Sequence, residues 1–421
     1  MALAYPTTVN ASFITKYLYP DGVSDLSVEE NPLLSVIKKG RFVDNGLGLG
    51  YVIPVVYDAG PGESKTIATA ITNAGAAQGG AFTVTHVGDW VVHELNGDVA
   101  AALAGGSKTA LMQLKAWHEL NFRQANARIS KELFGNGSCQ RGCLATTAGS
   151  TTLTLTLATK SDALLWNVGD IMTSIASAAL YGSKDTGTGT ITVIDESAGI
   201  ITATAGSSWN PVVGDYFFKE GDIGAAWATR KGISGFRAWL CGDAIATYGT
   251  LFGVARGAAK SRTCGWYIDC SGLGSAKSCL LRFLQFMGSR GQHPDTVICH
   301  PNFKAQLEEE LEGQVSIQRI PAQRLGGEAI GFGFDAMFVN GVKVLADYSC
   351  AKTEIFGLKL NTWSLRSVNG DVPRIMNYTG ADFMQAATAD TFQVRYGYYA
   401  NLACDRPDQN GFATVPAYLD L

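Results

Sequence analysis

The stretch between residues 58 and 80 most constrains what this chain can fold into. Its sequence, DAGPGESKTIATAITNAGAAQGG, is rich in Gly, Ala and Thr and nearly free of large apolar residues. Strand-like segments flank it, at Tyr51–Tyr57 before it and at Phe82–Thr85 and Trp90–Val92 after it. A connection of this length and composition cannot fold onto a core of its own. It predicts the tip of a long hairpin that spans residues 49–97 and extends away from the body of the protein.

Composition fits a protein whose surface is largely covered by something else. Charged residues make up 17% of the 421 residues, below the usual share of about 25%. Glycine is also abundant, with 49 residues, or about 12% against an average of roughly 7%. The cores of protein–protein interfaces are depleted in Lys, Glu and Asp because each buried charge must be desolvated. A β-rich domain with many turns would have a similar composition, so composition alone leaves both interpretations open.

Charge and hydropathy exclude several classes of protein. The formal net charge is −4, so no basic field indicates tight nucleic-acid binding, although a protein can enclose DNA without gripping it. The longest apolar runs, such as Ile53–Tyr57 and Cys279–Met287, are far shorter than the roughly 20 residues of a membrane span. Residues 1–20 lack the basic start and continuous apolar stretch of a signal peptide. We therefore expect no membrane partner and no export from the cytoplasm.

The chain around the hairpin divides into an arm and one long helix. Residues 1–48 are interrupted repeatedly by Pro and Gly and predict an extended N-terminal arm. In residues 98–136, apolar side chains recur on one face from a candidate N-cap at Ser107 to a stop at Gly135. A helix of about 28 residues would form a rod of roughly 42 Å, longer than the usual three or four turns.

Two further regions differ in character. Residues 137–222 contain several short alternating strands with Gly turns, including Val-Gly-Asp at 168–170 and 213–215, and predict an inserted small antiparallel β-barrel or sandwich. From residue 223 the pattern is mixed. Residues 223–339 predict an α/β domain, and residues 340–421 predict mainly strands, the last of which stops before Pro407. The fold class that follows is α+β.

Two segments resemble phosphate-binding loops but lack the residues that such loops need. Gly272–Ser278 follows a strand-like segment and precedes a predicted helix, which is the context of a P-loop. The motif requires Gly immediately before its Lys and Gly six residues before it, so that the backbone can wrap the phosphates. Those positions hold Ala276 and Ser271, and Gly105–Thr109 fails the same test. We expect a helix N-terminus capped by Ser rather than a nucleotide site.

No metal or catalytic site can be assembled from the sequence. His93 and His118 each begin a His-Glu-Leu-Asn segment, but the second His of the zinc-protease motif is replaced by Gly97 and Phe122. His300 precedes a proline and is expected to begin a helix. The nine cysteines are scattered, and we expect most to be buried, reduced and apolar in behaviour. We therefore expect no catalytic, cofactor-binding or metal-binding residues, and no enzyme.

Two smaller features have ordinary explanations at this stage. Cys139 and Cys143 are the one pair of cysteines close enough in sequence to suggest a local pair, and no second Cys or His pair stands at zinc-finger spacing. The acidic run Glu308–Glu310 is most simply the solvated face of its helix.

The order of the elements resembles the tailed-bacteriophage major capsid protein of the Hong Kong 97 type. Three phrases carry the resemblance: PDTVICHPNFKAQLEEELEG, GVKVLADYSCAKTEIFGLKLNTWSL and DTFQVRYGYYANLACDRPDQNG. It covers residues 28–136 and 223–412, and residues 137–222 fall outside it. It implies that residues 49–97 are the E-loop, that the long helix is the spine of a peripheral domain, and that residues 228–335 form the axial domain. Strands near 340–360 and 390–404 would return to the peripheral domain.

The resemblance implies a structural role. The chain would self-assemble into pentamers and hexamers of an icosahedral phage head that encloses double-stranded DNA, with portal, scaffold and cement proteins as possible partners. It would be found in the virion after assembly in the host cytoplasm. Lys65 lies in the hairpin tip, where some family members form Lys–Asn crosslinks between subunits; the alternative is a solvated or ion-paired lysine. The sequence departs from the family pattern in lacking a long charged helix before the arm and in carrying the 137–222 insertion.

Two other functions stay open at this stage. One is a nucleotide-binding enzyme built on residues 228–335 around the degenerate P-loop. The other is a β-rich carbohydrate-binding module centred on residues 137–222. Neither explains most of the chain, whereas a shell subunit needs many neighbours and no active site.

Overall fold

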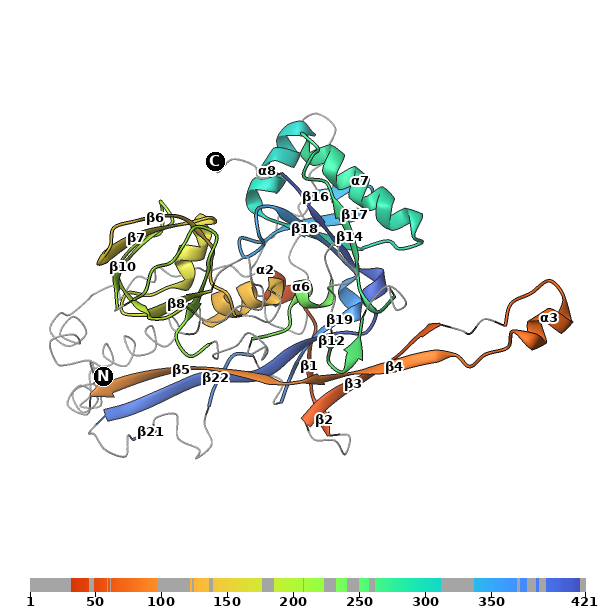
Figure 1. The fold of residues 1–421 in the computed structure, drawn as a ribbon, viewed down its shortest axis with the longest axis horizontal. Coiled ribbons are helices and arrows are strands. Elements are labelled where there is room, and N and C mark those ends of the chain that lie inside the picture. Colours follow the sequence, from red (N-terminus) through yellow and green to blue (C-terminus); the bar gives the residue numbers. More distant parts are fainter. Residues whose placement is uncertain are drawn as a thin grey trace, which may run out of the picture.

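The computed structural model describes most of the chain, with gaps. The described residues are 32–44, 49–58, 60, 62–96, 122, 125–135, 139–175, 185–206, 208–222, 232–240, 250–256, 262–311, 337–368, 372–376, 384–385 and 391–416. Within them lie three six-stranded sheets, one three-stranded sheet that forms an arm, and helices that pack on the larger sheets (Figure 1).

The predicted hairpin is confirmed as a projecting arm. Strand β3 (Leu49–Asp58) pairs with β4 (Gln78–Thr85) in an antiparallel ribbon, and the short β2 (Val43–Asp44) extends it at the base. The ribbon leaves the body and ends in a tip that contains a short helix, α3 (Ile67–Thr72) (Figure 1). The sequence did not predict this helix.

The hairpin is shorter than predicted, because β5 (Val87–Asn96) does not belong to it. Strand β5 pairs along its whole length with β22 (Thr391–Cys404), the long C-terminal strand. The alternating side chains Val394, Tyr396 and Tyr398 of β22 are buried, and β5 supplies the neighbouring strand that this buried row needs. The sequence shows three strand-like stretches in succession but not which of them leaves the hairpin. The predicted boundary at residue 97 is wrong, and the ribbon ends at residue 85.

The first six-stranded sheet, called the lower sheet here, is built around β22. Its strands are β1 (Lys39–Arg41), β19 (Trp363–Ser367), β22, β20 (Arg374–Ile375), β21 (Met384–Gln385) and β5. Residues 125–134 form the described part of the predicted long helix and end before Gly135, as expected. Its predicted start at Ser107 lies outside the described residues. Ile129, Leu133 and Phe134 of this helix are buried in the core beside the lower sheet.

Part of the predicted N-terminal arm packs on its own subunit. Helix α2 (Pro32–Val36) buries Leu33 and Leu34 in the main core, and β1 pairs in parallel with β19. The Leu33 N–H also donates to Asp347 at 3.1 Å. Residues 32–44 are therefore a component of the core, whereas residues 1–31 lie outside the described residues.

The second six-stranded sheet, called the upper sheet, carries two helices on its outer face (Figure 1). Its strands in order are β14 (Trp266–Asp269), β23 (Gly411–Thr414), β18 (Glu354–Leu358), β15 (Thr296–Cys299), β17 (Val342–Ala346) and β16 (Met337–Val339). Helices α7 (Ala276–Ser289) and α8 (Pro301–Glu310) cover it and match their predicted positions.

The upper sheet corrects the predicted role of residues 340–360. Strands β17 and β18 were expected to return to the sheet of the long helix, but they flank β15 instead. All four residues of β15 are buried, so its backbone groups must be paired on both edges. Strand β17 satisfies one edge and β18 the other, and β23 from near the C-terminus adds to β18.

The insertion forms the third six-stranded sheet, in the order β11-β8-β9-β10-β7-β6. The strands are antiparallel: β6 (Leu144–Ala148), β7 (Thr152–Leu157), β8 (Ile171–Ile175), β9 (Gly189–Asp195), β10 (Ile200–Ala205) and β11 (Tyr216–Lys219), with a 3₁₀ helix η1 (Lys160–Leu165). Backbone hydrogen bonds between 141–144 and 214–217 link the two outermost strands, β6 and β11. Its apolar cluster includes Leu155, Trp166, Trp209 and Phe217 and is separate from the other cores. We call this unit the module.

The main core lies between the lower and upper sheets. Its centre is aromatic: Phe236 of α6 (Phe236–Trp239) meets Trp363 edge to face at 4.7 Å, and Phe82 of the arm base meets Trp239 at 5.1 Å. The remaining short elements are β12 (Thr250–Leu251), β13 (Val254–Ala255), η4 (Leu360–Thr362) and η5 (Pro407–Gln409). A second core, beneath α7 and α8, fills the outer side of the upper sheet.

Candidate functional site: the projecting arm and the charged junction

The arm changes character along its length. At its base, Ile53, Phe82 and Val84 are buried in the main core, and the Thr83 N–H donates to the Phe252 carbonyl at 2.9 Å. Beyond the base no residue of α3 is buried. Ile67 and Ile71 are 79% and 68% exposed. The arm is therefore anchored at one end and carries an uncovered apolar pair at the other.

Lys65, the one site residue named from the sequence, lies in this tip just before α3. Its side chain is exposed, and no hydrogen bond or ion pair joins it to another described residue. The Thr66 N–H next to it donates to the Ser64 hydroxyl, and the Thr66 hydroxyl donates to the Thr69 hydroxyl within the tip. Lys65 is thus presented outward at the far end of the arm.

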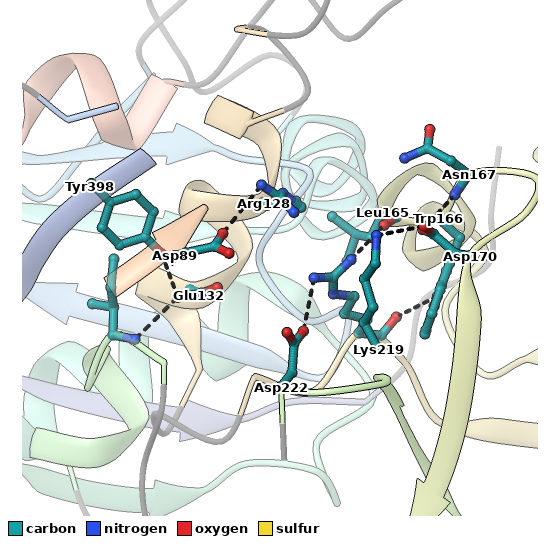
Figure 2. Close-up of polar contacts among 12 residues, drawn as sticks. Asp89, Arg128, Glu132, Leu165, Trp166, Asn167, Asp170, Lys219, Asp222 and Tyr398 are labelled. Carbon is teal, nitrogen blue, oxygen red and sulfur yellow. Dashed lines mark hydrogen bonds and ion pairs between the residues drawn. The ribbon is translucent and has the colours of Figure 1, made fainter. Parts of the chain in front are cut away.

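A charged junction forms where the module meets the body (Figure 2). Arg141 and Asp222, at the two ends of the module, form an ion pair at 2.9 Å. The Arg141 guanidinium also lies over the Trp166 ring, whose Nε1–H donates to the Arg141 carbonyl at 3.2 Å. Lys219 pairs with Asp170 at 2.5 Å. These contacts join the first and last residues of the module, a region that we call its neck.

Two ion pairs involve the long helix. Lys131 Nζ lies 2.6 Å from Asp162 of η1, which ties the helix to the module, and Arg128 lies 3.2 Å from Asp89 of β5. A cavity of about 610 Å³ lies beside them, lined by residues of β5, the helix and the module neck. The junction therefore fixes how the module sits on the helix, while leaving space between them.

Glu132 is the buried carboxyl of the junction. Its Oε2 accepts a hydrogen bond from the Ile233 N–H at 3.1 Å and another from the Tyr398 hydroxyl at 3.0 Å (Figure 2). Burial, and then the negative charge of Asp89, raise the pKa of Glu132 to about 7 against these bonds. Burial also raises the pKa of the nearby Cys139 thiol, which therefore stays protonated and is a poor nucleophile. The chemistry available at this site is proton uptake close to neutral pH.

The degenerate P-loop is occupied by a carboxylate of the chain itself. Ser275 caps α7 as expected, accepting from the Ser278 N–H at 3.3 Å. The Glu310 carboxylate accepts from the Ala276 N–H at 3.0 Å, the Lys277 N–H at 2.8 Å and the Ser275 hydroxyl at 2.7 Å. A negative group at this helix N-terminus is favourable, and Glu310 fills the place that a phosphate would take. The prediction that the Glu308–Glu310 run is only a solvated face is wrong for Glu310.

The other residues named from the sequence have structural roles or lie outside the described residues. His300 is the N-cap of α8, and its Nδ1 accepts from the Asn302 N–H at 3.2 Å, as expected. Cys139 and Cys143 are free thiols and do not form a pair. The other described cysteines are also free thiols, and all of these are buried. His118 lies outside the described residues. Among the described residues, no cluster of three or more potential metal ligands occurs, and no helix is long and apolar enough to cross a membrane.

Comparisons with known proteins identify the fold. No protein-family model and no curated protein matches the sequence. Among solved structures, the chain is similar to one described as the cyanophage A-1(L) capsid asymmetric unit, with a TM-score of 0.53 and 12% identity over 94% of this chain and 95% of the other. The predicted α+β fold of the Hong Kong 97 type is confirmed.

Two more distant structures were also matched. One is the capsid of a native gene transfer agent (GTA) particle, with a TM-score of 0.47 and 7% identity over 99% of this chain and 100% of the other. The second is the SrpI encapsulin complex of Synechococcus elongatus, with a TM-score of 0.45 and 11% identity over 100% of this chain and 99% of the other.

The first prediction concerns the pH dependence that Glu132 imposes. Because its pKa in the folded protein lies near 7, above the usual 4.5, the folded state binds a proton that the unfolded chain has released between these values. The free energy of unfolding should therefore fall as pH rises through this window. Glu132→Gln removes the charge, so it should raise that free energy at pH 8 by up to roughly 3 kcal/mol and change little at pH 4.5. Urea unfolding at both pH values measures this.

A matched control is Glu196→Gln, which removes an exposed carboxyl from a turn of the module. It should leave the pH dependence unchanged. If Glu132→Gln instead lowers the free energy of unfolding equally at both pH values, the carboxyl does not gain a proton on folding and the assignment is wrong.

The second prediction concerns Glu310. Partial burial raises its pKa, but the hydrogen bonds from Lys277, Ser275 and Ala276 outweigh this effect and hold the pKa below its ordinary value. The carboxylate therefore stabilises the fold above its ordinary pKa, and this stabilisation is lost as pH falls through the lowered value. Glu310→Gln should lower the free energy of unfolding by about 1 kcal/mol at pH 7. The exposed Glu309→Gln is the control, and equal effects of the two variants would contradict the capping role.

Proposed function

We propose that this chain is a structural subunit of an icosahedral bacteriophage head, assembling as pentamers and hexamers around double-stranded DNA, and that it is not an enzyme. The observation that carries the proposal is the arm. It is anchored in the subunit's core at its base, yet its tip exposes Ile67 and Ile71 and buries nothing. A two-stranded ribbon of this kind is marginal in water by itself. Contact with a second copy would cover the tip and account for its sequence.

The shared fold supports the same proposal. The structure matched over nearly its whole length is described as a phage capsid. A closed shell forms when one patch of each copy meets a different patch of the next and the rotation closes. An arm that leaves its own body supplies one such patch. The low share of charged residues is consistent with a surface that is mostly covered after assembly.

The nucleotide-binding alternative has less support. The N–H groups that would hold a phosphate at the start of α7 already bind Glu310. The carbohydrate-binding alternative would use only the module and would leave the arm and both larger sheets without a role.

Regions of the chain correspond to the parts of such a subunit. The arm corresponds to the E-loop, the helix ending at Phe134 to the spine of the peripheral domain, and α7 and α8 with the upper sheet to the axial domain. Lys65 is a candidate contact with a neighbouring subunit because it lies exposed in the arm tip. Portal, scaffold and cement proteins are possible further partners. The location would be the virion shell, after assembly in the host cytoplasm.

The third prediction tests assembly directly. The purified chain should form rings or shells, seen by negative-stain electron microscopy and by sedimentation. Replacing residues 59–77 with a short Gly-Ser turn should preserve folding, because Asp58 and Gln78 are already paired and Phe82 stays in the core. This variant should no longer form closed particles. A full-length chain that stays monomeric at high concentration would contradict the proposed function.

The fourth prediction concerns the module, which we propose is an autonomous unit on the outer surface of the shell. It has its own apolar cluster, its outermost strands are linked by backbone bonds, and Arg141–Asp222 holds its two ends together. Replacing residues 140–221 with a short Gly-Ser linker should therefore leave the remaining chain folded, while particles become less stable to heat. Circular dichroism and thermal melting of particles measure these effects. An insoluble shortened chain would show that the module belongs to the main core.

A further inference from the structure

Two cysteines in the second core, beneath α7, point toward each other. Cys270 follows β14 directly, Cys279 is the fourth residue of α7, and both are buried free thiols. The Sγ atom of Cys279 lies 3.5 Å from the Cys270 carbonyl oxygen, and the Sγ atom of Cys270 lies 4.0 Å from the Cys279 carbonyl oxygen. Each sulfur therefore lies against the backbone of the other cysteine.

Two other buried cysteines of the upper sheet have different contacts. The Sγ atom of Cys299 lies 3.5 Å from the Leu345 carbonyl oxygen. The Sγ atom of Cys350 lies 3.4 Å from the Glu354 carbonyl oxygen. These contacts are those of a small core residue with a weakly polar S–H group. The mutual approach of two cysteines is a separate arrangement, because a disulfide needs two side chains that are directed at each other.

The segment that joins these two cysteines is the one that resembles a phosphate-binding loop. Gly272 and Gly274 are exposed, and a Cβ atom at either position would meet nothing within 4 Å. Leu273 packs against the second core, and its N–H donates to the Cys270 carbonyl at 3.0 Å. Residues 271–275 thus cover the two thiols, and opening of this short loop would expose them while the sheet stays intact.

We propose that Cys270 and Cys279 are a redox pair that closes to a disulfide bond within one chain. The oxidant is a small disulfide such as oxidised glutathione. The thiolate of one cysteine attacks a sulfur of this compound, forms a mixed disulfide and releases one glutathione thiol. The thiolate of the other cysteine then attacks the cysteine sulfur of the mixed disulfide and releases the second glutathione thiol. The cysteines lose two protons and two electrons, and the small disulfide gains them.

The bond would tie an edge strand of the upper sheet to the helix that covers it. Strand β14 pairs with β23 and ends the order of this sheet as far as the structure describes it. A crosslink from β14 to α7 restricts the unfolded chain and so stabilises the fold. The cytoplasm keeps such a pair reduced, whereas an oxidising medium closes it. For a particle that leaves its host, as proposed above, closure would follow release.

The charges around the pair determine how fast it closes. Burial, and then the negative charge of Cys279, raise the pKa of Cys270 to about 11. Arg282 of α7 opposes this shift, and Asp269 at the end of β14 adds to it. Glu310 of α8 also faces the first turn of α7. The thiolate is the reactive form, so closure should be slow at pH 7 and faster as the pH rises toward this pKa.

Peptide mapping of the full-length chain tests the bond. The reduced, folded protein is incubated with oxidised glutathione, then unfolded in the presence of N-ethylmaleimide and digested with trypsin. Trypsin cleaves after Lys277, between the two cysteines, so the expected product joins peptides 263–277 and 278–282 until dithiothreitol separates them. Separate peptides that carry N-ethylmaleimide, or a lasting glutathione adduct on Cys270 or Cys279, overturn the inference. Whether shells form does not affect this result, so failure of the proposed function is a separate outcome.

Cys264 lies on the same tryptic peptide as Cys270 and provides the matched control. Cys264→Ala should keep the joined peptides, whereas Cys270→Ala should lose them. Chymotrypsin, which cleaves after Tyr267, separates these two cysteines and gives the same assignment in the unsubstituted chain. A bond from Cys279 to Cys264, or one that forms only after unfolding, overturns the inference.

Stability gives a second readout. Oxidation should raise the urea concentration at the unfolding midpoint, and dithiothreitol should return it to the starting value. Cys270→Ala should show neither change. A midpoint that stays the same or falls when the bond is fully formed overturns the stabilising role of the pair.

Discussion

The rest of the structure depends on the buried side chain of Asn410, which links two of the chain segments that connect the large sheets. Two of the chain's passages between the large sheets, from β18 to β19 and from β22 to β23, come close together in the fold. Asn410 lies between these crossings and is fully buried. Its Oδ1 accepts from the Lys359 N–H at 2.7 Å and the Trp363 Nε1–H at 2.8 Å. Its Nδ2 donates to the Thr362 hydroxyl and to the Arg406 carbonyl. Without these bonds the crossings would leave buried polar groups unpaired, which is costly.

The arm depends on the core that this crossing closes. Trp363 follows the first crossing directly and packs against Phe236, and through Trp239 the aromatic contacts continue to Phe82 at the base of the arm. The base is therefore held by the same cluster that joins the sheets, while the tip is left uncovered. A rigid base and an exposed end suit an element that acts on another molecule, since binding then costs little ordering of the base.

Local pattern was enough to predict some elements but not their partners. The composition of residues 58–80 showed that this stretch could not bury itself, and His300 followed by a proline correctly marked the start of α8. Pairing could not be read in the same way. Strand β5 follows the hairpin in sequence but pairs with a strand some 300 residues later, because the partner is set by which buried row needs covering. Long-range pairings of this kind leave no signal in a single local pattern.

The surroundings of the side chains at the site could not be predicted from local sequence either. Glu132 falls on a predicted helix, but its raised pKa arises from burial in the folded chain and from the negative charge of Asp89, which is distant in sequence. Glu310 was assigned to a solvated face because helical periodicity cannot show that the start of α7 lies beside the end of α8. Trp90 was placed on a strand, but whether it faced the helix or solvent depended on the register with β22. In each case the sequence identified the residue and the tertiary structure determined its environment.

Several ion pairs of this chain lie where its parts join. Lys131–Asp162 ties the helix to the module, Arg141–Asp222 closes the neck, and Arg128–Asp89 joins the helix to β5. Ion pairs of this kind contribute modest net free energy but discriminate strongly against wrong orientations. The arm tip exposes the apolar pair Ile67 and Ile71, and apolar contact favours association without fixing its direction. The low overall charge is thus compatible with a precise architecture, because a small number of ion pairs sets the orientation of the parts inside the subunit.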